Sequence, residues 1–133
     1  MEYLELAGAV ILNENKSILL MHRNTPKLKQ WELPGGKLEI GEEPEQAAKR
    51  ELKEELGIDV EVKKYLGCEE ILDIDCILKY HWYLCKLKNQ EPKLMEEKFD
   101  EIKYFSKEDL QNSIEELSSN MKTFMKKIDI TNL

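Results

Sequence analysis

Apolar and polar residues along this chain alternate in some stretches and recur every three or four positions in others, which predicts a mixture of strands and helices. Stretches rich in apolar, β-branched or aromatic residues, the composition typical of strands, cover residues 4–12, 17–21, 58–62, 65–72, 74–87 and 102–105. The polar, turn-forming residues 13–16 join the first two stretches and predict a β-hairpin. The sequence contains no internal repeat or linker, so we predict a single mixed α/β domain over residues 1–133.

The clearest predicted helix runs from Pro44 to Leu56. Proline lacks a backbone N–H and is tolerated in the first helical turn, where that donor has no partner in the helix. Ala48, Leu52 and Leu56 form one apolar stripe at intervals of four residues, and Gly57 is typical of the residue that ends a helix.

Further helical segments are predicted toward the C-terminus. Ser106 predicts the start of a short helical turn through Leu110, with Asp109 in the position of a capping box. Apolar residues at helical spacing predict an amphipathic helix over residues 114–128. The polar residues 89–100 predict a loop.

Bulk composition narrows the class of protein. Hydrophobic residues make up 41% and charged residues 35% of the chain, which is typical of a globular protein and not of a disordered one. No apolar run approaches the roughly 20 residues of a membrane helix, and the first residues lack the pattern of a signal peptide. We therefore expect a cytoplasmic protein with no membrane partner. The net charge of −7 predicts a surface that repels nucleic acid, so a small anionic substrate would need a local source of positive charge.

The cysteines do not indicate a disulfide framework. Cys68, Cys76 and Cys85 cannot all pair within one chain and have no Cys-x-x-Cys spacing. Reduced, mostly buried thiols are the expected state in a reducing compartment. Because His22 and His81 are the only histidines, the sequence does not favour a zinc site of Cys and His ligands.

One face of the predicted helix is strongly acidic. Glu51, Glu54 and Glu55 are spaced so that their carboxylates share one side, where like charges destabilise an isolated helix by roughly 0.2–0.5 kcal/mol per pair. Mg²⁺ prefers carboxylate oxygens and bridges to substrate phosphates, which gives such a cluster a use. Gly35 and Gly36, shortly before the helix, allow the backbone to approach a ligand closely, and a carbonyl there would complete an oxygen coordination shell. A solvated face in a glutamate-rich protein is the alternative interpretation.

The spacing of the glycines and the acidic helix resembles the Nudix box in full. The matching positions are Gly36, Glu42, Arg50-Glu51-Leu52, Glu54-Glu55 and Gly57-Ile58. A chance match at all of them is on the order of 10⁻⁷ per starting position. The flanking residues 31–37 and 104–110 are also similar to the family, so the resemblance spans most of the chain. It implies an α/β fold, a Nudix-like α/β/α sandwich with a central mixed β-sheet.

The resemblance also implies roles for residues of the box. The positions of its metal ligands correspond to the backbone carbonyl of Gly35 and to Glu51, Glu54 and Glu55. The implied cofactor is Mg²⁺, with Mn²⁺ able to substitute, and Glu51 is expected to be either a third ligand or an acid/base group. Arg50 is expected to orient a neighbouring glutamate through a charge-assisted hydrogen bond. Glu42 is expected to be a supporting carboxylate near the attacking water.

The family often adds a downstream acidic residue as a metal ligand or general base. By its distance before Tyr104, Glu97 is our first candidate for this catalytic role, and Glu96, Asp100 and Glu101 compete with it. A solvated loop charge is the alternative for each of them.

Basic and aromatic residues outside the box are candidates for substrate binding. Arg23, Lys27 and Lys37 are expected to hold phosphate oxygens, with a surface salt bridge as the alternative for Arg23. The aromatic candidates for a nucleobase slot are Trp31, Tyr80, Trp82 and Tyr83. Alternation along a strand sends some of these rings into the core, where they pack and do not contact a ligand.

The resemblance implies Mg²⁺-dependent hydrolysis of a phosphoanhydride bond, with a carboxylate helping a water molecule to attack one phosphorus atom. ADP-ribose hydrolases of the family tend to carry a proline that is absent at residues 73 and 74, and dinucleoside polyphosphate hydrolases a tyrosine that is absent at residue 75. We therefore predict a nucleoside triphosphate pyrophosphohydrolase that releases a nucleoside monophosphate and pyrophosphate. Nothing in the sequence selects an oxidised base.

Other functions remain as alternatives. ADP-ribose or another nucleotide sugar is the alternative substrate. A regulatory module that binds a nucleotide without hydrolysing it, or a structural domain with an incidental acidic helix, would be a non-enzyme. The presence of all the box glutamates favours an enzyme. A homodimer is implied only by analogy with the family.

Overall fold

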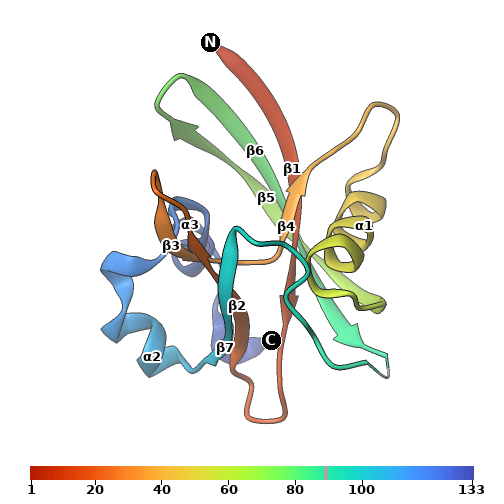
Figure 1. Ribbon diagram of the computed structural model, residues 1–133, viewed down its shortest axis with the longest axis vertical. Helices are drawn as coiled ribbons and strands as arrows, with labels where there is room; N and C mark the ends of the chain where they lie inside the picture. The colour runs from red at the N-terminus through yellow and green to blue at the C-terminus, as the bar shows by residue number, and fades with distance from the viewer. Residues whose placement is uncertain (89) are drawn as a thin grey trace.

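The computed structural model of the chain describes residues 1–88 and 90–133. The strands are β1 (Glu2–Ile11), β2 (Ile18–Asn24), β3 (Lys29–Glu32), β4 (Gly35–Lys37), β5 (Val60–Asp73), β6 (Cys76–Leu87) and β7 (Phe99–Phe105). The helices are α1 (Pro44–Leu56), α2 (Lys107–Asn112) and α3 (Ser119–Lys127), with the 3₁₀ turns η1 (Ile114–Glu116) and η2 (Ile130–Asn132) (Figure 1). The predicted loop over residues 89–100 begins at Asn89, which lies outside the described residues, and ends where β7 begins.

The strands divide into two sheets, whereas the resemblance implied one central sheet. The four-stranded sheet has the order β4-β1-β6-β5 and is mixed, because β1 pairs in parallel with β6 and antiparallel with β4. The three-stranded sheet has the order β3-β2-β7 and is antiparallel. The predicted α/β fold with a mixed sheet is therefore confirmed, with its strands shared between two sheets.

Two predictions about the strands are wrong, one about their pairing and one about their boundaries. β1 and β2 do not form a regular hairpin, because β1 pairs along its whole length with β6 and β2 pairs with β3 and β7. Among the described residues, an isolated bridge between Leu12 and Ile18 is all that remains of the predicted pairing. The stretches 58–62 and 65–72, predicted as separate strands, belong mostly to the continuous strand β5. Two irregularities in its pairing with β6 break the alternation that the sequence pattern relies on.

Buried side chains form a cluster on each face of the four-stranded sheet. On one face α1 contributes Ala47, Ala48, Leu52 and Leu56, all fully buried. On the other face α3 packs Phe124 edge-on against Trp82 of β6, with ring centroids 5.2 Å apart. Figure 1 shows α1 and α3 on opposite sides of the strands. The strand β2 of the three-stranded sheet contributes to both clusters, Leu19 and Met21 on the α1 side and Ile18 and Leu20 on the α3 side, so both sheets lie between the two helices.

The helix α1 begins and ends where the sequence predicts, and α2 begins where predicted but runs past Leu110 to Asn112. α1 begins at Pro44 and ends before Gly57, which has a φ of +66° and donates its N–H to the Lys53 carbonyl oxygen at 3.0 Å. The predicted capping box starts α2, because Ser106 Oγ accepts the Asp109 N–H and the Asp109 carboxylate accepts the Ser106 N–H, each at 3.0 Å. None of the described helices is long and apolar enough to cross a membrane.

The predicted terminal helix is shorter than its apolar pattern indicated. α3 begins only at Ser119, after Ser118, whose hydroxyl accepts the Met121 N–H at 3.0 Å. The Ser118 N–H donates to the Trp31 carbonyl oxygen at 2.9 Å, and this contact with β3 would be lost in an uninterrupted helix. Residues 114–116 form the separate turn η1.

The short strand β4 brings the glycine pair against β1 and α1. Its register with β1 places Gly35 opposite Gly8 and Gly36 opposite Ala7. A Cβ on Gly35 would lie 2.3 Å from the Ala7 carbonyl oxygen, and the φ of +154° at Gly35 is rarely adopted by other residues. A Cβ on Gly36 would lie 2.6 Å from the Glu51 carboxylate. Gly35 is therefore needed for β4 to lie this close to β1, and Gly36 leaves room for the Glu51 carboxylate.

Candidate active site

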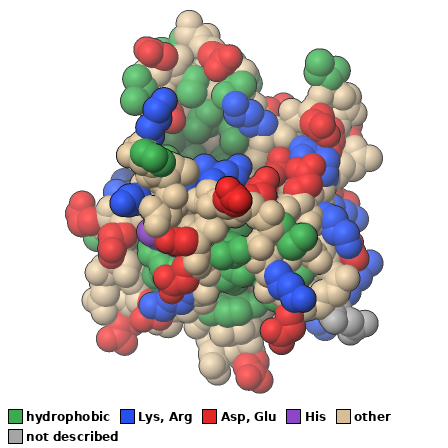
Figure 2. All heavy atoms as spheres, viewed as in Figure 1, with side chains coloured by type: hydrophobic (Ala, Val, Ile, Leu, Met, Phe, Trp, Pro, Cys, Tyr) green, Lys and Arg blue, Asp and Glu red, His purple; other side chains and the backbone are tan. Residues whose placement is uncertain are grey.

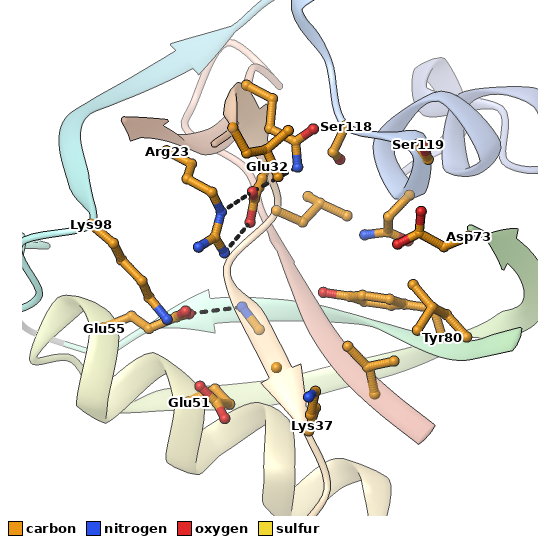
Figure 3. A pocket seen from close by; sticks show the side chains of 18 residues that line it. Arg23, Glu32, Lys37, Glu51, Glu55, Asp73, Tyr80, Lys98, Ser118 and Ser119 are labelled. Atoms are coloured by element: carbon orange, nitrogen blue, oxygen red, sulfur yellow. Dashed lines mark hydrogen bonds and ion pairs between the residues drawn. The ribbon is translucent and has the colours of Figure 1, made fainter. Parts of the chain in front are cut away.

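A cleft of about 540 Å³ lies between the two sheets, next to the side of α1 that carries the acidic residues (Figure 3). The charged side chains in its lining include Arg23, Glu32, Lys37, Glu51, Glu55 and Lys98. Figure 2 shows acidic and basic side chains side by side across this face of the molecule, below a hollow with apolar side chains. The cleft therefore combines a charged end with a less polar one.

Arg50 connects the loop before α1 to the acidic face of the helix. Its Nε donates to Glu42 at 2.8 Å, and its Nη1 donates to Glu51 and Glu54 at 3.0 Å each. Its Nη2 donates to the Lys37 carbonyl oxygen at 2.9 Å. The bond to Glu42 is the main cause that raises the pKa of Arg50 further above its usual range. This geometry fits the orienting role that the resemblance implied for Arg50.

Glu42 is held on Arg50 by both of its carboxylate oxygens. Besides the bond to Nε, its Oε1 accepts from Arg50 Nη2 at 3.0 Å and from the Glu39 N–H at 2.9 Å. The Arg50 bonds, and then the backbone bond, lower the pKa of Glu42. A carboxylate with a lowered pKa and occupied oxygens is a poor base. The geometry thus favours Glu42 as a support for Arg50 over contact with the attacking water.

Two carboxylates of α1 line the cleft, Glu51 and Glu55. Glu55 is 2% exposed, and its Oε1 accepts the Gly35 N–H at 2.8 Å. Burial raises the pKa of Glu55 to about 8; the Gly35 bond opposes this shift, and the charges of Glu51 and Glu96 add to it. Burial also raises the pKa of Glu51 against the lowering effect of Arg50. Desolvated carboxylates that repel each other favour a cation between them.

The loop before β7 brings Glu96 close to the carboxylates of Glu51 and Glu55, whereas Glu97 does not join them. The Met95 N–H donates to the Glu55 carbonyl oxygen at 3.0 Å, which anchors the loop at the C-terminal end of α1. Glu96 is then close enough to Glu51 and Glu55 for its charge to raise the pKa of both. The Glu97 side chain is exposed to solvent.

The other downstream candidates are engaged or exposed elsewhere. One carboxylate oxygen of Asp100 lies 2.8 Å from His22 Nδ1, and the other accepts from Asn24 Nδ2 at 2.7 Å. Glu101 is exposed and lies opposite His22 in the pairing of β7 with β2. On this geometry Glu96 replaces Glu97 as our first candidate.

The donor set fits a hard divalent cation. Among the described residues Glu96 Oε1 is buried and accepts no hydrogen bond, and the nearest cationic group, Lys98 Nζ, lies 3.7 Å from it, so a metal cation would satisfy this oxygen more fully. Within the described part of the chain, no three acidic, Cys or His side chains yet surround a single point. Arg50 holds Glu51 and Glu54 to itself, and the Glu54 side chain is 51% exposed. These two side chains would have to turn from Arg50 toward a cation.

The basic residues of the cleft are Arg23, Lys37 and Lys98, whereas Lys27 is not in its lining. Arg23 donates through Nε and Nη2 to the two carboxylate oxygens of Glu32, so the salt bridge that we kept as the alternative is formed in the cleft wall. The sequence pattern did not single out Lys98, because nothing in the local sequence indicates that its loop folds back over α1.

Among the four aromatic candidates, Tyr80 alone lines the cleft. Trp31, our first candidate for a nucleobase slot, packs edge-on against Phe105 with ring centroids 4.8 Å apart, outside the lining. Trp82 and Tyr83 are buried in the clusters on the α3 and α1 faces of the sheet. These three rings therefore contribute packing in this structure.

The end of the cleft away from the carboxylates is built from segments that the sequence pattern did not single out. Ser118, Ser119 and Asn120 line it at the start of α3, and Asp73 lines it at the end of β5. The Asn120 Oδ1 accepts the Trp82 Nε1–H at 2.9 Å, which fixes the amide and leaves its Nδ2 donors for other partners. Fixed polar groups beside apolar side chains are typical of a site for an organic group.

The comparisons with known proteins agree with this geometry. The NUDIX domain family matches residues 3–128. The 8-oxo-dGTP diphosphatase of Escherichia coli is 47% identical over 60 residues, which cover 44% of this chain and 46% of that protein. The ADP-ribose pyrophosphatase of Methanocaldococcus jannaschii is 42% identical over 76 residues, which cover 55% of this chain and 45% of that protein. The chain thus spans about half the length of these curated relatives.

Solved structures extend the similarity to the whole fold. The crystal structure of a MutT NUDIX hydrolase from Burkholderia pseudomallei superposes with a TM-score of 0.85 at 27% identity, covering 97% of this chain and 100% of that one. The family match includes the positions from Gly36 to Ile58 that resemble the Nudix box. This chain therefore belongs to the NUDIX domain family.

Proposed function

We propose that this protein hydrolyses a phosphoanhydride bond of nucleoside triphosphates in the presence of Mg²⁺ and releases a nucleoside monophosphate and pyrophosphate. The observation that carries the proposal is the composition of one cleft. Glu51 and Glu55 line one end, with Glu96 close enough to raise the pKa of both, and fixed polar groups with apolar neighbours form the other end. The first end suits phosphates neutralised by a cation, and the second suits a nucleoside.

The residues of the chain divide the work of the reaction. Bound at the carboxylates, Mg²⁺ would neutralise the phosphates and lower the pKa of water. The groups that would hold it are the Gly35 carbonyl and the carboxylates of Glu51, Glu54 and Glu55. Without the metal, Arg50 holds two of these carboxylates, Glu51 and Glu54, beside the site. Glu96 accepts the proton of the attacking water. Lys37 and Lys98 then bind outer phosphate oxygens.

The choice of a nucleoside triphosphate follows from the relatives and from the sequence. The two curated relatives are named for 8-oxo-dGTP and for ADP-ribose, and both molecules contain a phosphoanhydride bond. The missing proline at residues 73 and 74 favours the triphosphate over ADP-ribose. The complete set of box glutamates favours hydrolysis over a nucleotide-binding module.

A panel of substrates tests the proposal. Purified protein with Mg²⁺ is expected to turn over at least one nucleoside triphosphate, ordinary or oxidised, at least about tenfold more efficiently than ADP-ribose or a nucleotide sugar. Chelation of divalent ions is expected to stop turnover, because the carboxylates would then repel the phosphates. Detection of nucleoside monophosphate and pyrophosphate by ion-exchange chromatography measures the reaction. Preference for ADP-ribose would replace the proposed substrate, and turnover that survives chelation would contradict the mechanism.

A matched pair of substitutions tests the place of Glu96. Replacing Glu96 with glutamine is expected to lower kcat about 10- to 100-fold, because the carboxylate beside Glu51 and Glu55 is lost. Glu97→Gln removes the same charge one position away and is expected to stay within about twofold of the wild type. Steady-state kinetics at saturating Mg²⁺ measures both variants. A loss confined to Glu97→Gln, or equal in the two, would show that the loop positions a different carboxylate.

A further inference from the structure

The hydroxyl of Tyr80 is a polar group at the wall of the cleft for which the described residues provide no partner. The side chain is 7% exposed, and no described residue forms a hydrogen bond with its hydroxyl. Two glycines of neighbouring strands make room for it. A Cβ on Gly8 would lie 2.9 Å from the Tyr80 hydroxyl oxygen, and a Cβ on Gly35 would lie 2.8 Å from it. The phenol end of this side chain therefore occupies space that ordinary residues would fill.

The hydroxyl faces the centre of the cleft. In Figure 3 it points from β6 toward the gap between Arg23 and the hydrogen bond that joins Glu55 to Gly35. Burial, and then the charges of Glu55 and Glu32, raise the pKa of Tyr80 further above its usual range. The group is therefore a neutral O–H that is able to donate to an anionic oxygen.

The Tyr80 hydroxyl is not a buried unpartnered atom of the kind found at Glu96, so it remains open to the cleft although the rest of its side chain is buried. A hydroxyl that opens into a cleft and that no described residue engages is free to donate to a bound ligand. The hydroxyl lies between the carboxylate end of the cleft and the end formed by Ser119 and Asp73. In a nucleotide that spans the cleft, this is the position of the phosphate next to the sugar.

We propose that the Tyr80 hydroxyl binds the substrate by donating a hydrogen bond to an oxygen of the phosphate that carries the nucleoside. This inference rests on the proposed function, because it requires a nucleotide in the cleft. It makes Tyr80 a substrate-binding residue that recognises the phosphate next to the sugar. All nucleoside triphosphates share this phosphate, so Tyr80 does not discriminate between bases.

The test is Tyr80→Phe, which removes one oxygen atom and keeps the ring. With the best nucleoside triphosphate at saturating Mg²⁺, kcat/KM is expected to fall about 10- to 100-fold, the usual range for a hydrogen bond to a charged acceptor. The loss is expected to be the same for the matching 2′,3′-dideoxy substrate. Thermal unfolding is expected to give an equal or higher Tm, because the substitution removes an unpartnered polar group.

Tyr83→Phe is the matched control. Tyr83 lies three residues along the same strand on the opposite face and is 8% exposed, so the same atom is removed at the same burial away from the cleft. Its kcat/KM is expected to stay within about twofold of the wild type.

Each other outcome would overturn the inference. An active wild type with an unimpaired Tyr80→Phe variant removes it and leaves the proposed function intact. If the loss disappears with the dideoxy substrate, the Tyr80 hydroxyl binds the sugar and not the phosphate. If Tyr80→Phe needs more Mg²⁺ but has a normal kcat/KM at saturating Mg²⁺, the Tyr80 hydroxyl acts on Glu55 and not on the phosphate. A wild type that hydrolyses no nucleotide removes the proposed function and this inference together.

Discussion

Replacing Glu55 with glutamine is expected to lower kcat for the best nucleoside triphosphate by at least about 100-fold at saturating Mg²⁺. Glu55 is the most buried carboxylate of the cleft, and the Gly35 N–H fixes its orientation at 2.8 Å. Glutamine keeps the volume and an oxygen that accepts this bond, so the variant removes the charge and little else. Steady-state kinetics with increasing Mg²⁺ separates weak metal binding from slow chemistry.

A second substitution on the same helix controls for charge. Glu45→Gln removes an exposed carboxylate in the first turn of α1, where its partner is Lys49 at 3.8 Å. Its kcat is expected to stay within about twofold of the wild type. Near-normal turnover by Glu55→Gln would mean that this carboxylate does not bind the metal.

Glu55→Gln is also expected to stabilise the protein in the absence of metal. The pKa of Glu55 is about 8 in the fold and 4.5 as the reference value, so the folded state binds more protons between these pH values. Stability of the metal-free protein therefore falls as pH rises from about 5 to 8, by an amount on the order of 2–4 kcal/mol for this group. Thermal unfolding at pH 6 and pH 8 in chelator is expected to show this loss in the wild type and a smaller one in Glu55→Gln.

Gly35→Ala is expected to give the largest loss of stability, several kcal/mol, with a fall in Tm of about 10 °C or more. The added Cβ would lie 2.3 Å from the Ala7 carbonyl oxygen and 2.6 Å from the Gly8 Cα. Both are backbone atoms of β1, so neither can rotate away as a side chain would. Circular dichroism during heating measures the effect.

Gly41→Ala separates backbone strain from this steric clash. Gly41 has a φ of +81° with nothing within 4 Å of an added Cβ, so strain alone remains, at about 1–2 kcal/mol. A Gly35→Ala variant no less stable than Gly41→Ala would mean that β4 does not pack this closely on β1.

Local signals predicted the helix of the site well. α1 runs from Pro44 to Leu56 as predicted, because the proline, the apolar stripe and Gly57 all act within the helix or at its ends. Helical spacing also places Glu51 and Glu55 on one face without any knowledge of the rest of the chain. The hydrogen bonds of Arg50 join it to residues of α1 and of the segment just before α1. These partners lie within the Nudix box, so the resemblance predicted the orienting role of Arg50 as well.

Contacts between distant segments account for what the sequence could not predict. The position of Glu96 depends in part on the backbone bond from the Met95 N–H to the Glu55 carbonyl oxygen, one of several bonds that anchor its loop. The start of α3 depends in the same way on the bond from Ser118 to Trp31. Neither bond has a local sequence signal, because its partner is 40 or more residues away. The division of the strands into two sheets has the same cause.

The two ends of the cleft differ in how they are encoded. Most of the carboxylate end comes from one continuous stretch, residues 35–55, whose members depend on one another through Arg50 and the glycines. The opposite end is assembled from residues 73, 78 and 118–120, each on a separate element. Substitutions there are therefore expected to change which group the cleft binds, while the contacts within residues 35–55 stay intact. Gene duplication can therefore diversify the substrates of such a protein while its reaction is inherited intact.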